Sequence, residues 1–246
     1  MYGPRELALS RTSALPSRSG LAPDGNAVEL ACADGHQTVA VRVYTQYNPR
    51  MRIPRPGPNV PSRGNAFSHW LGRASYSVAG WKVIGNLPDI PKFVLIVAPH
   101  TSNWDFFVGV GALFGLGLRL SFLGKDSIFV QPVGAIMRWL GGMPVDRSVS
   151  RDRVTQMVDA FNKHDRLIFG IAPEGTRTKV SEWKTGFYHV AFGAKVPIVP
   201  VAFDYGKKAV IIGEPFNPTG DVSGDIAKLR AFFANVTAKR PENYVP

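Results

Sequence analysis

The sequence predicts an α/β fold in which helices flank a largely parallel central sheet. Two runs of mostly aliphatic residues, at 93–98 (FVLIVA) and 166–172 (RLIFGIA), are short and continuous, as in strands buried on both faces. Between them, apolar residues recur at i, i+3, i+4 and i+7 from Val154, which is the spacing of one helix face. Strand and helix patterns alternate in this way along most of the chain. Such alternation is typical of layered folds with a parallel sheet.

Five elements are expected around the first buried strand. Residues 68–79 carry apolar side chains at mixed helical spacing, which predicts a helix, and residues 81–84 predict a short strand that ends at Gly85. After the buried strand we expect a helix from about residue 102 and a strand over 119–123. The apolar segment 133–140 then predicts a helix that ends at Gly141 and Gly142.

The second half of the chain repeats the alternation. The amphipathic segment 151–162 predicts a helix, and the second buried strand follows it. We then expect a helix over 186–193, strands over 196–203 and 207–212, and a closing helix over 225–239. The longest apolar stretch, at 106–118, has thirteen residues, of which four are glycines. It is shorter than the about 18 residues of a membrane span, so it predicts a buried helix and no transmembrane span.

The composition changes near residue 65. All Phe, Trp and Lys residues lie after this point, whereas 8 of the 20 prolines lie before it. A stretch with so few large apolar side chains has little surface to bury. We therefore expect residues 1–64 to be a disordered or non-native N-terminal extension and residues 65–246 to form a single domain. Within the extension, residues 37–44 alternate like a strand, and residues 49–58 resemble an extended, proline-rich linker.

The overall composition narrows the class of protein. The 246-residue chain has a formal net charge of +11, with 45% hydrophobic and 19% charged residues, which excludes wholesale disorder. The single cysteine, Cys32, excludes a disulfide framework and a cysteine-based zinc site. The positive charge predicts an anionic partner, which is nucleic acid, a phospholipid surface or a phosphorylated metabolite. Because the basic residues are scattered and no nucleic-acid-binding motif is present, we do not expect nucleic acid as the partner.

Polar residues follow the first buried strand, at the position where functional groups of parallel sheets gather. Residues 98–105 read APHTSNWD. If His100 lies in the loop and Asp105 in the first helical turn, the carboxylate can reach one imidazole nitrogen and raise the basicity of the other. No Gly-x-Ser-x-Gly elbow supplies a protein nucleophile, so such a base would activate a hydroxyl of the substrate. From the spacing alone, a structural role for this pair is the alternative.

Polar residues also follow the second buried strand, where residues 172–177 read APEGTR. This segment offers a flexible turn, a hydroxyl, backbone N–H groups and the guanidinium of Arg177, which together suit a phosphate. A capped turn with a surface ion pair is the alternative. A third segment, 141–147 (GGMPVDR), places Arg147 after a turn, where it would either join the anion site or form a surface salt bridge.

Together these residues resemble the lysophosphatidate acyltransferases (1-acylglycerol-3-phosphate O-acyltransferases) of glycerolipid synthesis. His100 and Asp105 match the family's His-x4-Asp block, and residues 142–147, 173–177 and 196–200 match its second, third and fourth blocks in the same order. The resemblance extends over roughly residues 81–212. Pro99 stands where such enzymes commonly carry Asn, a departure that leaves the acceptor open more than the reaction.

The resemblance implies a mechanism and a substrate set. His100 would take the proton of the acceptor hydroxyl, which attacks the thioester of acyl-CoA or acyl-carrier protein, and Asp105 would orient His100. The implied phosphate-binding residues are Glu174, Gly175, Thr176, Arg177, Arg147 and Lys125. No step requires a metal or another cofactor, and the sequence lacks metal-ligand spacing such as His-Glu-x-x-His.

The resemblance also implies the partners and the location. The acceptor would be lysophosphatidate or a similar lipid, and the protein would lie peripherally at the cytoplasmic face of a membrane. Trp70, Trp139 and nearby basic residues are candidates for contact with an anionic surface. Three alternatives stay open: transfer to a lysophospholipid or an amino-acid lipid, hydrolysis of the thioester by water, and a non-catalytic lipid-binding relative.

Overall fold

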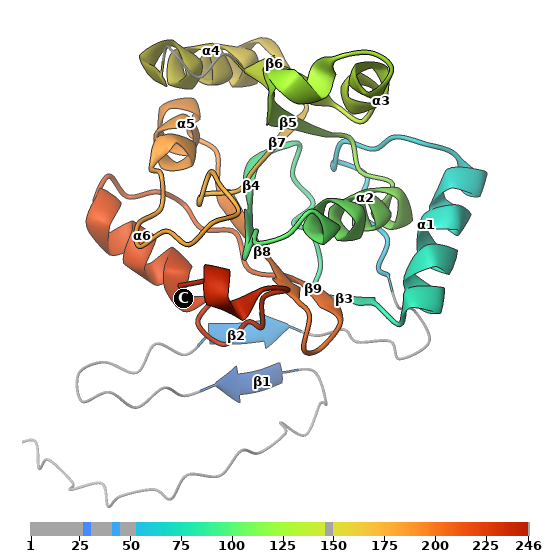
Figure 1. Cartoon of the computed structure of the whole chain (residues 1–246). Coiled ribbons are helices and arrows are strands. Elements are labelled where there is room, and N and C mark those ends of the chain that lie inside the picture. The colour runs from blue at the N-terminus through green and yellow to red at the C-terminus, as the bar shows by residue number, and fades with distance from the viewer. Residues whose placement is uncertain (1–26, 31–40, 45–52, 146–149, 246) are drawn as a thin grey trace, which may run out of the picture. The chain divides into compact units, whose positions relative to one another are not determined.

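Seven strands form the central sheet, in the order β3-β9-β8-β4-β7-β5-β6 (Figure 1). The computed structural model describes residues 27–30, 41–44, 53–145 and 150–245. The strands of the sheet are β3 (Lys82–Ile84), β4 (Lys92–Ala98), β5 (Leu120–Lys125), β6 (Gly142–Val145), β7 (Leu167–Ile171), β8 (Ile198–Asp204) and β9 (Ala209–Ile212). All neighbours in this order pair in parallel except β8 and β9, which are antiparallel. The predicted α/β class with a largely parallel sheet is confirmed.

Helices cover both faces of this sheet. They are α1 (Ala66–Ala79), α2 (Trp104–Leu116), α3 (Val133–Trp139), α4 (Ser150–Lys163), α5 (Gly186–Ala194) and α6 (Val222–Ala231), with short 3-10 turns η1 (Asp126–Phe129) and η2 (Pro241–Asn243). In Figure 1, α1 and α2 lie on one side of the sheet and α4, α5 and α6 on the other. The segments predicted from periodicity as helices all form helices, and their ends agree to within three residues except at the end of the last helix.

The central strand β4 explains why two cores form. Phe93 and Leu95 belong to the hydrophobic cluster beneath α1 and α2, whereas Val94 and Ile96 belong to the cluster beneath α4, α5 and α6. Successive side chains of a strand point to opposite faces, so a strand between two helical layers must be apolar at every position. This is the physical reason for the continuous aliphatic run in the sequence.

The helices α1 and α2 approach each other closely. A Cβ added to Gly72 of α1 would lie 2.3 Å from the backbone nitrogen of Gly115 in α2, so only glycine fits at this crossing. Of the glycines in the apolar stretch 106–118, Gly111 and Gly115 therefore serve helix packing, since both lie against α1. That stretch was expected to be buried, but α2 is buried on one side only: Phe107 is 63% exposed. No helix among the described residues is long and apolar enough to cross a membrane.

Two chain segments differ from the sequence-based expectation. The last helix, predicted over 225–239, ends at Ala231 because Phe233 turns into the core and contacts Trp183, with ring centroids 5.4 Å apart. Upstream of the expected boundary at residue 65, Ile53 and Val60 are buried in the core beneath α1 and α2. Farther upstream, β1 (Ala27–Leu30) and β2 (Val41–Tyr44) pair as an antiparallel two-stranded sheet.

Candidate active site

The carboxyl ends of neighbouring parallel strands bring the two polar clusters together. His100 lies in the loop after β4, and Glu174 follows β7, the parallel neighbour of β4. Asp105 lies in the first turn of α2. Its Oδ2 atom is 3.4 Å from Nδ1 of His100, and the side chain of His100 is 24% exposed. The pair therefore has the arrangement expected from its spacing, with one ring nitrogen facing the carboxylate and the imidazole accessible from solvent.

Asp105 is held by three donors although it is almost fully buried. Besides the contact with His100, its Oδ2 accepts the backbone N–H of Ser102 at 2.8 Å, and its Oδ1 accepts the hydroxyl of Tyr205 at 2.7 Å. Burial opposes ionisation, but the hydrogen bonds from His100, Tyr205 and Ser102 outweigh it and lower the pKa of the Asp105 carboxyl. An ionised carboxylate facing Nδ1 favours the tautomer that carries its proton there, which leaves Nε2 as the basic nitrogen.

Glu174 supports the loop that carries His100. It is buried, and its Oε2 accepts the backbone N–H of His100 at 2.8 Å. Burial raises the pKa of the Glu174 carboxyl, and the nearby charge of Asp105 adds to this effect. The other oxygen, Oε1, is buried without a hydrogen-bond partner. The contacts of Glu174 thus point to the His100 loop, whereas its predicted part in binding a phosphate stays a prediction.

The turn after Glu174 exposes polar groups next to this pair. Gly175 has a φ of +66°, a conformation that favours glycine, and the hydroxyls of Thr176 and Thr178 lie 3.1 Å apart. Arg177 is exposed, and no ion pair or hydrogen bond is found for its guanidinium among the described residues. The segment combines a free cation with a turn of small residues, which is the chemistry that a phosphate requires.

Lys184 is a cation of this turn that sequence reasoning missed. A Cβ on Gly175 would lie 2.9 Å from Cδ and Cε of Lys184 and 3.0 Å from its Nζ, so the lysine side chain lies directly over the glycine. The backbone N–H of Lys184 donates to the carbonyl of Pro173 at 2.9 Å, which fixes the approach. Lys184 is seven residues beyond Arg177, and no local pattern indicates that the chain returns to the turn.

Tyr205 is the second residue that sequence reasoning missed. It directly follows β8, which lies beside β4, so its hydroxyl reaches Asp105 from the neighbouring strand. Its ring packs edge-on against Trp81 with centroids 5.0 Å apart. Burial and the hydrogen bond to Asp105 raise the pKa of the Tyr205 phenol well above its ordinary range, so it stays a donor. Its position directly after a buried strand, where the functional groups of parallel sheets gather, is the signal in the sequence that would have identified Tyr205.

The two remaining predicted phosphate ligands are only partly located. Lys125 ends β5, whose neighbour β7 runs parallel to it, so its backbone lies at the same edge of the sheet as Glu174. The side chain of Lys125 and the whole of Arg147 lie outside the described part of the chain. Within that part, no group of three or more His, Cys, Asp or Glu side chains is arranged to hold a metal ion.

The sequence of this chain is similar to those of known acyltransferases. Residues 83–204 match the family model described as Acyltransferase. The chain is 27% identical over 202 residues to the 1-acyl-sn-glycerol-3-phosphate acyltransferase of Haemophilus influenzae, which covers 73% of this chain and 82% of that protein. It is 29% identical over 154 residues to the enzyme of the same name from Escherichia coli, covering 58% of this chain and 61% of that protein.

A solved structure is also similar to this chain. The crystal structure of the 1-acyl-sn-glycerophosphate acyltransferase PlsC from Thermotoga maritima aligns with a TM-score of 0.48 at 18% identity. The alignment covers 70% of this chain and 80% of that one.

Proposed function

Because the chain belongs to the acyltransferase family, we propose that it transfers a fatty acyl group from a thioester donor to the hydroxyl of a lysophosphatidate-like acceptor in phospholipid synthesis. The donor is acyl-CoA or acyl-carrier protein. The observation that carries the proposal is the His100–Asp105 pair, with Nδ1 and Oδ2 3.4 Å apart at the carboxyl edge of the sheet, beside the turn that carries Arg177. This arrangement offers a base for a substrate hydroxyl and a cation for a substrate phosphate.

His100 acts as the general base in this scheme. Its Nε2 takes the proton of the acceptor hydroxyl as the hydroxyl oxygen attacks the thioester carbonyl carbon. The tetrahedral intermediate then collapses, the carbon–sulfur bond breaks, and the imidazolium returns the proton to the leaving thiolate. Asp105 does not touch the substrate; it orients His100 through Nδ1 and stabilises the positive charge that forms on the ring. Every atom and proton is accounted for without a metal or a further cofactor.

Cations at the same edge bind the acceptor phosphate in the proposal. Arg177 is suited to bidentate contact, and Lys184 supplies a second charge over Gly175. Backbone N–H groups around Thr176 add donors, and Lys125 and Arg147 join the set as proposed ligands. Glu174 positions the His100 loop through its hydrogen bond to the backbone N–H of His100.

A membrane surface supplies the acceptor and receives the product, because both are lipids. Large apolar side chains are exposed on α1, α2 and α3, namely Phe67, Trp70, Trp104, Phe107, Ile136 and Trp139. Aromatic side chains favour the interface between headgroups and acyl chains, and the net charge of +11 favours an anionic surface. We therefore include peripheral association with an anionic membrane in the proposal.

An acceptor panel tests the proposed reaction. The purified protein is incubated with labelled acyl-CoA or acyl-carrier protein and with lysophosphatidate, lysophosphatidylcholine or an acylated amino acid, and the lipid products are separated. We expect labelled phosphatidate from lysophosphatidate. Release of free fatty acid without any acylated acceptor would identify a thioester hydrolase instead, and the absence of both products would contradict catalysis.

A further inference from the structure

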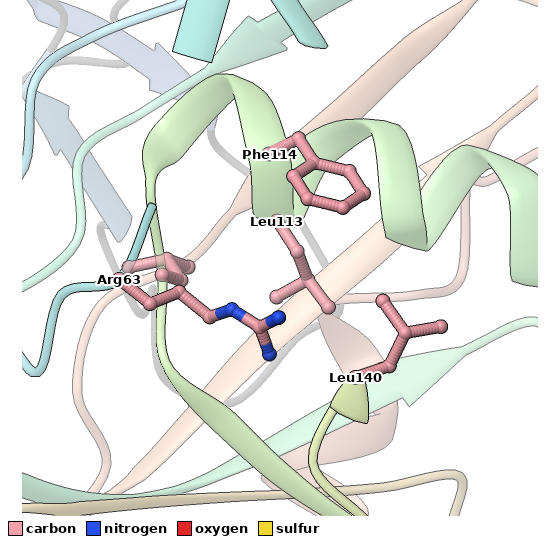
Figure 2. Close-up of a pocket in the computed structure, with 5 residues that line it drawn as sticks. Arg63, Leu113, Phe114 and Leu140 are labelled. Carbon is pink, nitrogen blue, oxygen red and sulfur yellow. The ribbon is translucent and has the colours of Figure 1, made fainter. Parts of the chain in front are cut away.

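A cleft of about 420 Å³ opens between the start of α1, the end of α2 and the end of α3. It is lined by Arg63, Gly64, Asn65, Ser68, Phe114, Arg119 and Trp139, none of which is acidic. The Arg63 guanidinium carbon lies 4.6 Å from the centroid of the Trp139 ring. Figure 2 shows the side chain of Arg63 extending toward Leu113 and Leu140, with which it lines a second, smaller and mostly apolar pocket.

This cleft is separate from the proposed active site. The backbone N–H of Arg63 donates to the carbonyl of Gly117, the residue that caps the end of α2, and Arg119 directly precedes β5. Asp105 lies in the first turn of the same helix. At a rise of 1.5 Å per residue, the two ends of α2 are about 18 Å apart. The cleft is therefore at the amino edge of β5, whereas His100 is at the carboxyl edge of the sheet.

The charges of the cleft are not balanced within the described residues. No ion pair joins Arg63 or Arg119 to a carboxylate there. Arg63 and Arg119 line the same cleft. Burial lowers the pKa of the Arg63 guanidinium, and the positive charge of Arg119 lowers it further. Two neighbouring guanidinium groups without a carboxylate are stabilised by an external anion, and their planar forks match the oxygens of a phosphate.

We propose that this cleft binds the phosphate of an anionic membrane lipid headgroup. The surroundings favour a lipid because the exposed ring of Trp139 lines the cleft, and further exposed aromatic side chains lie on α1, whose start borders it. Trp139 is 63% exposed, and Phe67 and Trp70 on α1 stack with ring centroids 6.0 Å apart. The aromatic rings enter the headgroup region of the bilayer, and Arg63 and Arg119 bind a lipid phosphate there. The site deepens the membrane association that forms part of the proposed function.

Vesicle binding tests the cleft with charge-matched variants. The full chain carrying Arg63→Gln and Arg119→Gln is compared with one carrying Lys163→Gln and Lys195→Asn. The control lysines are exposed, one ending α4 and one following α5, and Asn suits the φ of +54° at Lys195. Sedimentation uses vesicles of phosphatidylcholine with and without phosphatidylglycerol. At about 1 kcal/mol per basic residue, we expect the cleft variant to bind anionic vesicles about thirtyfold more weakly.

The outcomes distinguish binding at the cleft from nonspecific attraction between a basic protein and an anionic membrane. A loss of binding in the cleft variant that clearly exceeds the loss in the control supports the proposal. Equal losses, or unchanged binding of the cleft variant, would overturn it. Because Arg119 is exposed, Arg119→Glu serves as a second variant that does not disturb the core, and it should weaken binding further than the neutral substitution at that position.

Two further measurements identify the source of the phosphate and isolate this site from the reaction. Soluble glycerol 3-phosphate should not displace the protein from anionic vesicles; displacement at low concentration would assign the cleft to a soluble phosphate. Acyl transfer to a short-chain, monomeric lysophosphatidate should be unchanged in the cleft variant. Normal vesicle binding without any acyl transfer by the wild-type chain would refute the proposed reaction and leave the cleft intact.

Discussion

Replacing Tyr205 by phenylalanine removes one oxygen and breaks a contact on which the proposed mechanism depends. The hydroxyl of Tyr205 donates to Oδ1 of Asp105 at 2.7 Å, and the carboxylate is 1% exposed, so no water can readily replace the donor. The ring stays, and with it the edge-on contact with Trp81. We expect Tyr205→Phe to leave the fold intact and to raise the pKa of the Asp105 carboxyl toward its ordinary value.

The expected loss of stability and activity follows from the charge of Asp105, which accepts the hydrogen bond of Tyr205. A hydrogen bond to a charged group contributes about 1.5–3 kcal/mol to stability, and its loss should lower the free energy of unfolding at neutral pH by that amount. Each unit by which the pKa of Asp105 rises is equivalent to about 1.4 kcal/mol of lost carboxylate stabilisation. If that loss falls on the step that charges His100, kcat decreases about tenfold per unit. The KM for the acceptor should not change, because Tyr205 does not touch it.

The pH dependence of stability has a definite sign. The pKa of Asp105 is lowered in the folded state, so its contribution to stability is present above the ordinary carboxyl pKa and is lost as the pH falls through the folded value. The variant lacks part of this contribution. The difference in unfolding free energy between wild type and Tyr205→Phe should therefore be largest near neutral pH and shrink as the pH falls through the acidic range.

Urea denaturation across this pH range, together with steady-state kinetics, measures both effects. Tyr76→Phe is the matched control, because the hydroxyl of Tyr76 donates to the backbone carbonyl of Val108 and no hydrogen bond is found between it and Asp105 or His100. It should lower stability by a pH-independent amount and leave kcat unchanged. If Tyr205→Phe kept the wild-type kcat and showed a stability loss that did not vary with pH, the positioning role of Tyr205 would be wrong.

Three further predictions concern the phosphate turn and the helix packing. Lys184→Gln should raise the KM for the acceptor about tenfold with little change in kcat, whereas Lys179→Gln in the same loop should change neither, as initial rates at varied acceptor concentration will show. Gly175→Ala should lower the unfolding free energy by about 1–2 kcal/mol because of its φ of +66°, and should also raise the acceptor KM by displacing Lys184. Gly72→Ala should lower the unfolding free energy by about 1–3 kcal/mol, measured by urea denaturation, because α1 and α2 must separate; unchanged stability would contradict the close packing.

Local signals in the sequence were sufficient for most of the fold. The aliphatic run of β4 and the periodicity from Val154 are strong because burial on two faces and on one helix stripe leaves little freedom of composition. The strand β6 was not predicted, because Gly142 and Pro144 are residue types that are uncommon in strands. A proline is tolerated there because β6 is the last strand in the sheet order, at an edge.

In the candidate site too, contacts between residues close in sequence were predictable, whereas contacts between distant residues were not. The His100–Asp105 contact was predictable because both residues lie within one strand-to-helix connection. Tyr205 reaches Asp105 across 100 residues of sequence, which requires knowing that β8 lies beside β4. The early end of α6 has a similar cause. Helical propensity could continue past Ala231, but the burial of Phe233 in the core determines where the chain turns.

The central claim is that His100 is the base of acyl transfer, and one comparison tests it most directly. Initial rates of phosphatidate formation are measured for wild type, His100→Ala and His164→Ala, the last being an exposed histidine after α4. Loss of a general base should lower the rate of His100→Ala by about 10²–10⁴-fold while vesicle binding and thermal stability stay near wild type. His164→Ala should retain full activity. Transfer by His100→Ala at the wild-type rate would contradict the mechanism.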